Sequence, residues 1–132
     1  MSVSKKNDMR TPYAKISHLG AAHGGTTEHI RQRVTALAIA PLAIFFLVSI
    51  VALAGTDYET AHRYLAHPLV SILLLALIGA SIMHMRIGMQ IVIEDYVHTD
   101  RLKQVTLIAN TFFSYAVGLA CVFAALKIGF GS

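Results

Sequence analysis

Residues 81–98 read SIMHMRIGMQIVIEDYVH and decide the fold, because they continue a long apolar run while placing a histidine, an arginine and a glycine within it. The run starts at Pro68, a residue well suited to the first turn of a helix. From Pro68 to about Ile93 it is long enough to cross a bilayer, which takes about 20 apolar residues. An ionisable side chain in hydrocarbon is costly and indicates a functional site by default. His84 is therefore the first candidate for function.

Two further stretches have the same apolar character. Residues 34–54 carry no charge, and residues 105–128 form another apolar run. Pro41 lies within the first stretch, where a membrane helix tolerates a proline with a kink. Of the 132 residues, 55% are hydrophobic and only 14% are charged, whereas a soluble domain this small needs more polar surface. The sequence therefore predicts an all-α integral membrane protein with three transmembrane helices over about 34–54, 68–93 and 105–128.

The N-terminal part of the chain is polar. Residues 1–26 are expected to form a polar segment, and residues 27–130 a three-helix membrane domain. The first helix should begin near residue 27, with Thr26 or Thr27 as its N-cap. We expect no cleaved signal peptide, because the first apolar run starts only at Val34 and is too long for one.

Two polar connections join the three spans. The first covers residues 55–67, and residues 60–66 within it favour a short interfacial helix. The second covers residues 94–104. In the third span Asn110, Ser114 and Gly118 recur every four residues, and such a row of small or weakly polar residues lets membrane helices approach closely. We interpret this row as a packing surface.

The lysines and arginines predict how the chain crosses the membrane. Six lie in residues 1–33 and two, Arg101 and Lys103, in the second connection, whereas the opposite side has only Arg63 and Lys127. The positive-inside rule then places the N-terminus in the cytoplasm and the C-terminus in the periplasm of a bacterial inner membrane, or the N-terminus in the matrix of a mitochondrion. Because the charges gather at the ends of the spans, the net charge of +4 does not indicate a nucleic-acid partner.

His84 lies ten residues before Glu94, which places its imidazole about 15 Å inward from the end of the helix. Gly88 is about 40° round the helix from His84, and Asp95 about 20°. A neutral imidazole is a good axial ligand for haem iron, and a flat porphyrin needs small neighbours such as Gly88. The alternative is a histidine that only hydrogen-bonds a neighbouring helix. A bare metal ion would need further ligands, and none lies three or four residues away.

His84 is the only histidine at this depth, so a second axial ligand would have to come from another chain. A haem would thus imply a partner membrane subunit or a homodimer. The single cysteine, Cys121, excludes an internal disulfide, and its apolar surroundings indicate a packing role.

Four polar residues near the span ends have more than one interpretation. Arg86 is about 200° from His84 and could curl round to a haem propionate, snorkel to the cytoplasmic surface, or line a quinone entrance. Arg33 could pair with a propionate or a lipid phosphate, or act as a topological anchor. Asp95 and Tyr96 could form an interfacial pair, or the tyrosine hydroxyl could hold a quinone carbonyl while the carboxylate relays protons.

The pattern His84-x-x-x-Gly88-x-x-x-x-x-x-Asp95-Tyr96-Val97 resembles the hydrophobic membrane anchor of succinate dehydrogenase, the smaller of the two anchors of respiratory complex II. Its longer form, HMRIGMQIVIEDYVH, is similar to the alphaproteobacterial type. The resemblance extends to Gln32-Arg33-Val34-Thr35-Ala36 and to the three-span layout, and it covers about residues 25 to 130.

The resemblance implies a heteromeric, haem-binding helix bundle. It implies that His84 is an axial ligand of haem b shared with the other anchor, the cytochrome b subunit, and that Arg33 lies near the haem propionates. It also implies that Tyr96 hydrogen-bonds ubiquinone, with Asp95 beside it. The further partners are the iron–sulfur subunit and the flavoprotein subunit, where succinate is oxidised.

The chain itself has no flavin fingerprint and no cysteine cluster, so we interpret it as a non-catalytic anchor in electron transfer to ubiquinone. One alternative is the anchor of a fumarate reductase, which runs the reaction in reverse. Another, from a different class, is a small structural or transport membrane protein without haem.

Overall fold

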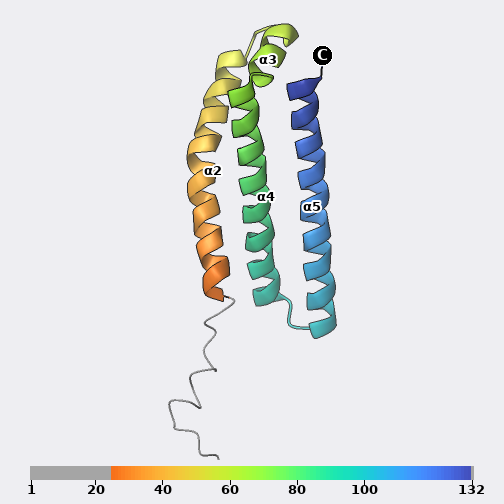
Figure 1. Cartoon of the computed structure of the whole chain (residues 1–132). Coiled ribbons are helices and arrows are strands. Elements are labelled where there is room, and N and C mark those ends of the chain that lie inside the picture. Colours follow the sequence, from red (N-terminus) through yellow and green to blue (C-terminus); the bar gives the residue numbers. More distant parts are fainter. Residues whose placement is uncertain (1–24, 132) are drawn as a thin grey trace, which may run out of the picture.

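The computed structural model describes residues 25–131, and within this range the chain forms helices and no strand. The helices are α2 (Gly25–Leu53), α3 (Tyr58–Leu65), α4 (Pro68–Tyr96) and α5 (Asp100–Phe130). Three of them, α2, α4 and α5, are long and apolar enough to cross a membrane, as Figure 1 shows by their length. The predicted all-α fold with three membrane-spanning helices is therefore confirmed. The first 24 residues of the expected polar segment lie outside the described range.

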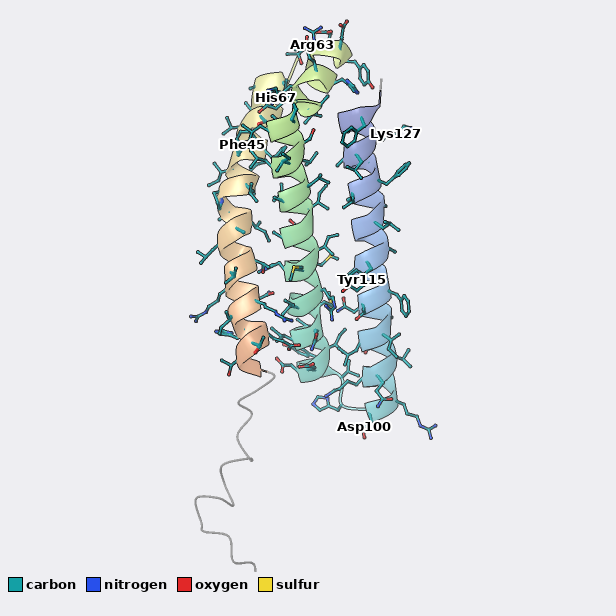
Figure 2. The ribbon with its side chains drawn as sticks, in the orientation of Figure 1. Phe45, Arg63, His67, Asp100, Tyr115 and Lys127 are labelled. Atoms are coloured by element: carbon teal, nitrogen blue, oxygen red, sulfur yellow. The ribbon has the colours of Figure 1, made fainter. Side chains whose placement is uncertain are left out.

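The three long helices stand side by side with alternating directions, and α4 is the central one (Figure 1). It packs against α2 on one side and against α5 on the other. The N-terminal end of α2 and the turn between α4 and α5 lie at one end of the molecule. The short helix α3 and the C-terminal end of α5 lie at the other end. In Figure 2, Asp100 and Lys127 mark these two ends of α5.

Most large apolar side chains of the long helices point outward and are exposed, including Leu37, Val51 and Leu119. The buried apolar residues are few: Phe46, Val70, Ile87, Ile93 and Ala125. A helix that is apolar on its outer face meets lipid or another membrane helix. The described chain is thus one layer of helices with apolar surfaces on its outside.

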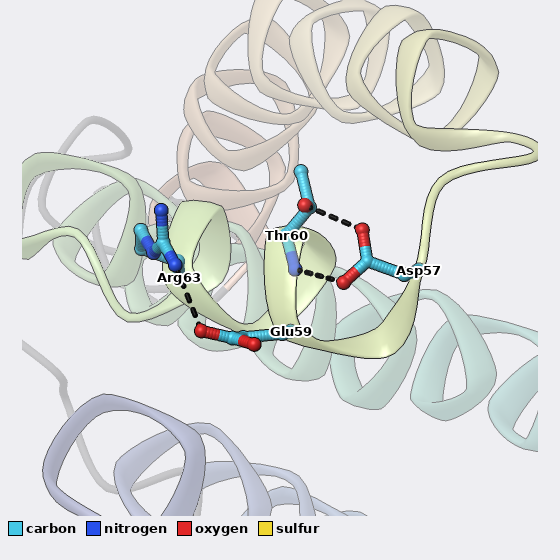
Figure 3. A network of polar contacts seen from close by, with 4 residues as sticks. All are labelled: Asp57, Glu59, Thr60 and Arg63. Atoms are coloured by element: carbon cyan, nitrogen blue, oxygen red, sulfur yellow. Dashed lines mark hydrogen bonds and ion pairs between the residues drawn. The ribbon is translucent and has the colours of Figure 1, made fainter.

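Local hydrogen bonds fix α3. Asp57 is its N-cap, where the carboxylate accepts a hydrogen bond of 2.6 Å from the Thr60 hydroxyl and a longer one, 3.4 Å, from the Thr60 backbone N–H (Figure 3). The Thr60 hydroxyl bond is the main cause that lowers the pKa of Asp57 below its ordinary value of 3.8. Arg63 pairs with Glu59 at 2.9 Å, one turn away. The cap explains why α3 begins at Tyr58, two residues before the predicted start.

The polar connection expected over residues 94–104 is shorter in the structure. The helix α4 continues to Tyr96 and α5 begins at Asp100, which leaves residues 97–99 between them. The Lys103 backbone N–H donates to the Thr99 carbonyl at 2.8 Å, and its ammonium donates to the Glu94 carbonyl at 3.1 Å. Polar residues therefore extend both helices instead of forming a loop, because their backbone groups bond within the helices and the Lys103 ammonium bonds a carbonyl in the last turn of α4.

Small residues of α5 pack against α4, as the row in the sequence predicts. Ser114 is fully buried, and a Cβ atom on Gly118 would lie 2.7 Å from the Ile82 side chain. The Asn110 amide donates to the Arg86 carbonyl at 3.0 Å across the same contact. This α4–α5 seam is defined by Asn110, Ser114, Gly118 and the residues of α4 that they touch.

Candidate functional site

His84 faces α2, and two polar side chains of α2 meet its two ring nitrogens. Thr35 Oγ1 lies 3.2 Å from His84 Nδ1, and Gln32 Nε2 lies 3.4 Å from His84 Nε2. Thr35 is buried, while His84 and Gln32 are partly buried. The apolar span thus carries its one histidine against a polar patch of the neighbouring helix, and we call this contact the α2–α4 seam.

The sequence did not single out Gln32 and Thr35 as site residues. In the sequence they stand only within the run of residues 32–36 that carries the family resemblance. A signal was nevertheless present: they are polar, three residues apart on one helix face, and they stand where the first apolar run begins. Pairing them with His84 required knowing which face of α4 turns toward α2.

Gly88 takes part in the same contact. A Cβ atom on Gly88 would lie 3.1 Å from Gln32 Nε2, so the missing side chain makes room for the Gln32 carboxamide. The sequence predicts that the missing side chain of Gly88 makes room for a porphyrin. In this structure Gln32 occupies that space. Gln32 Oε1 is buried and has no hydrogen-bond partner among the described residues.

These residues fit a haem iron better than a bare metal ion. Within residues 25–131, no group of three or more His, Cys, Asp or Glu side chains could hold a metal ion. A haem iron needs only axial ligands from protein, because the porphyrin supplies the other four. The partner that His84 Nε2 has is weak, since the Gln32 contact is long and the other end of that amide is unpaired.

Asp95 and Tyr96 lie in the last turn of α4, far from His84. Twelve residues separate Tyr96 from His84, which corresponds to about 18 Å along the helix. Both are exposed, Tyr96 at 79%. Next to them Gln90 donates to the carboxylates of Glu28 and Glu94 at 3.0 and 2.9 Å. The structure therefore separates the two predicted sites, one within the seam and one at the helix end.

The two arginines lie in different surroundings. Arg33 is exposed on α2, beside Gln32, and forms no ion pair with any described residue. The Arg86 guanidinium lies over the Tyr115 ring at 5.8 Å, and Figure 2 shows Tyr115 on α5. Arg86 Nε is buried without a partner in the described part of the chain. Arg86 therefore faces α5, away from His84, as its angle round the helix predicts.

Comparison with known proteins defines the class. A family model described as the succinate dehydrogenase/fumarate reductase transmembrane subunit matches residues 7–118. The chain belongs to this family, and the resemblance found in its sequence motif is confirmed. It is thus a multi-pass membrane subunit of a quinone oxidoreductase complex, which implies contact with other subunits of that complex and with the bilayer.

Individual relatives agree with this assignment. The succinate dehydrogenase hydrophobic membrane anchor subunit of Rickettsia bellii is 30% identical over 122 residues, which cover 92% of this chain and 98% of that protein. The subunit of the same name from Paracoccus denitrificans is 28% identical over 122 residues, 92% of this chain and 94% of that protein. No solved structure matches the chain.

Proposed function

We propose that this anchor subunit binds haem b through His84 Nε2 and shares the haem with a second anchor subunit, the cytochrome b subunit. When bound, the haem supplies a one-electron carrier within the membrane. Tyr96 and Asp95 form part of the ubiquinone reduction site. The same end of the helices docks the iron–sulfur subunit, which in turn holds the flavoprotein subunit. This chain performs no succinate chemistry itself.

The observation that carries the proposal is the environment of His84. Its imidazole lies within an apolar span, one nitrogen is beside a buried hydroxyl, and the other has only a long contact with an amide. Within residues 25–131 the ring nitrogens of His84 bond to Gln32 and Thr35 and to no histidine, so we assign the second axial ligand to the partner anchor. Arg33, exposed one residue from Gln32, is a suitable cation for a haem propionate.

Exposure and chemistry support a quinone role for the end of α4. The Tyr96 hydroxyl can donate to a quinone carbonyl, and the Asp95 carboxylate can exchange protons with water. The positive-inside rule places this end and the N-terminal end of α2 on the cytoplasmic side of a bacterial inner membrane, and the C-terminus in the periplasm. The quinone site and the soluble subunits would then share one side.

The family also includes fumarate reductases, in which the reaction runs the other way. The named relatives are succinate dehydrogenase subunits, which favours ubiquinone as the electron acceptor. Identifying the quinone that co-purifies with the native complex decides the direction, because a fumarate reductase uses a quinone of low potential.

The haem assignment is tested by replacing His84 with alanine in the whole complex. His84→Ala should remove most of the Soret absorbance of haem b, because one axial ligand is lost. His67→Ala is the matched control: this exposed histidine caps α4 without a side-chain hydrogen bond. An unchanged Soret band in the His84→Ala complex would refute the assignment.

The quinone assignment is tested by Tyr96→Phe, which removes only a hydroxyl. Loss of one hydrogen bond to the substrate should slow ubiquinone reduction by about two- to tenfold. Succinate oxidation with a soluble dye should stay at the wild-type rate. Tyr58→Phe, a change at an equally exposed tyrosine of the opposite end, is the control. Equal loss of both activities in Tyr96→Phe would argue against a quinone role.

A further inference from the structure

The Thr35 hydroxyl lies between the backbone of α2 and one ring nitrogen of His84. Thr35 Oγ1 lies 2.9 Å from the Arg31 carbonyl oxygen and 3.0 Å from the Gln32 carbonyl oxygen, as well as 3.2 Å from His84 Nδ1. A hydroxyl has one hydrogen, and carbonyl oxygens can only accept. The two backbone contacts are the shorter ones and favour the hydroxyl hydrogen, which leaves Oγ1 available as an acceptor toward Nδ1.

The acceptor at Nδ1 has a consequence for the rest of the ring. With Oγ1 as the acceptor, the neutral imidazole carries its hydrogen on Nδ1, and Nε2 keeps its lone pair. Thr35 is only 8% exposed, so no water competes for this bond from an open surface. The backbone bonds to α2 also hold the threonine in one rotamer, because they lock its hydroxyl against the preceding turn.

We propose that Thr35 is a positioning residue for the axial ligand: its hydroxyl fixes the Nδ1–H tautomer and the ring orientation of His84, and thereby lowers the reduction potential of the haem. This inference rests on the proposed function, in which His84 Nε2 binds the iron. An acceptor on Nδ1–H makes the imidazole a stronger donor, as outer hydrogen bonds to metal-binding histidines do. A stronger donor stabilises ferric over ferrous iron.

Gln32 has the opposite relation to the ligand. Its amide meets the Nε2 lone pair, which can serve only one partner, so an iron on Nε2 would replace this contact. The contact between Gln32 Nε2 and His84 Nε2 is long, and Gln32 Oε1 has no partner among the described residues, so losing this contact costs little free energy. The Thr35 contact is with Nδ1, on the far side of the ring, so an iron on Nε2 would leave it in place. Thr35 and not Gln32 is therefore the residue that tunes the bound haem.

The test uses the intact complex and measures the midpoint potential and haem content of three variants. Thr35→Val keeps the shape and removes the acceptor, Thr35→Ser restores a hydroxyl, and Thr106→Val is the matched control. Thr106 on α5 makes the same two backbone bonds, at 2.8 and 3.0 Å, with no histidine beside it. The variants thus separate the bond to His84 from the local helix bonds.

We expect Thr35→Val to shift the ferric–ferrous equilibrium about three- to tenfold toward ferrous haem, a rise of about 28 to 59 mV for one electron. Thr35→Ser and Thr106→Val should match the wild type in potential and in haem content. Loss of haem from Thr35→Val alone, with all subunits present and Thr35→Ser intact, would also support the proposal, because outer-shell changes weaken metal binding.

Two results would overturn the inference. The first is a Thr35→Val complex whose haem midpoint potential equals that of the wild type, and whose ferric haem gives the same low-temperature electron paramagnetic resonance spectrum as the wild type. The second is a Thr35→Ser complex as perturbed as Thr35→Val, since that would show a role for the methyl group. In either case the proposed haem ligand would stand. A wild-type complex without haem b, or a His84→Ala complex with an unchanged spectrum, would instead reject the ligand and the inference together.

Discussion

The two seams of α4 use different chemistry on opposite sides of one helix. Toward α5, small side chains bring the backbones together: Ser114 is fully buried and Gly118 lies against Ile82. Toward α2, the contact is polar, with Thr35 and Gln32 on either nitrogen of His84. The first seam is tightly packed at Ser114 and Gly118, whereas the second contains an amide that a ligand could replace.

This difference suggests that the α4–α5 seam stabilises the fold and that the α2–α4 seam is suited to bind a ligand. In a bilayer, helices associate through close packing and interhelical hydrogen bonds, since lipid is as apolar as the helices themselves. The α4–α5 seam has both features and is suited to fix the scaffold. Each seam has a buried polar atom without a partner among the described residues, Arg86 Nε toward α5 and Gln32 Oε1 toward α2. Only the α2–α4 seam also has a weakly partnered ring nitrogen, which is expected where a cofactor replaces a contact.

Filling the α4–α5 seam should have the largest effect on stability. Ser114→Leu introduces a large side chain where none is accommodated, and overpacking of this kind costs about 1–3 kcal/mol. Thermal unfolding of the purified complex should occur at a lower temperature than for the wild type. Ala116→Leu, two residues away on the exposed face, should unfold as the wild type does. Similar unfolding of both variants would mean that Ser114 is not in a tight contact.

Changing the polar seam should have a smaller effect, and in the other direction. Gln32→Leu removes a buried oxygen that has no partner, and such a group costs about 1–3 kcal/mol when left unpaired. The change also removes the amide contact with His84, which offsets part of this gain. The unfolding temperature should therefore stay the same or rise, with haem content retained. Gln90→Leu is the contrasting variant and should be destabilising, because its amide bonds two carboxylates. A Gln32→Leu complex that unfolds earlier would show that Gln32 is needed after haem has bound.

The smallest effect concerns α3, which packs against α4 and α5 at the end of the molecule away from the turn between α4 and α5. The Thr60 hydroxyl lowers the pKa of Asp57, so this cap stabilises α3 fully above the ordinary value of 3.8 and loses its effect as the pH falls through the lower folded value. Thr60→Val should raise the Asp57 pKa toward 3.8, as carboxyl NMR titration would measure. An unchanged pKa would exclude the hydroxyl as its cause.

Much of the scaffold was predictable from the sequence. The apolar runs gave the three spans, Pro68 marked the start of α4, and the row of small residues identified a packing face of α5, although not that α4 is the helix it meets. The angle of Arg86 round the helix also predicted that it faces away from His84, and it contacts Tyr115 of α5. These features depend on local spacing along one helix, which a sequence states directly.

The surroundings of His84 were not predictable in the same way. In a soluble helix the apolar stripe marks the buried face, but here both lipid-facing and packed faces are apolar, so hydropathy does not say which helix lies opposite His84. Gln32 and Thr35 contact His84 only because α2 packs antiparallel to α4 in a register that places them level with His84. The room beside Gly88 was predicted, but its occupant, Gln32, was not.

The ligand role of His84 is tested most directly by exchanging it for another ligand. If His84 binds the iron, His84→Met would place a thioether on the haem in its stead, and methionine ligation raises the potential of a haem. A redox titration followed by visible spectroscopy should show shifted haem b bands and a midpoint potential above that of the wild type. Unchanged bands together with an unchanged potential would show that His84 does not bind the iron.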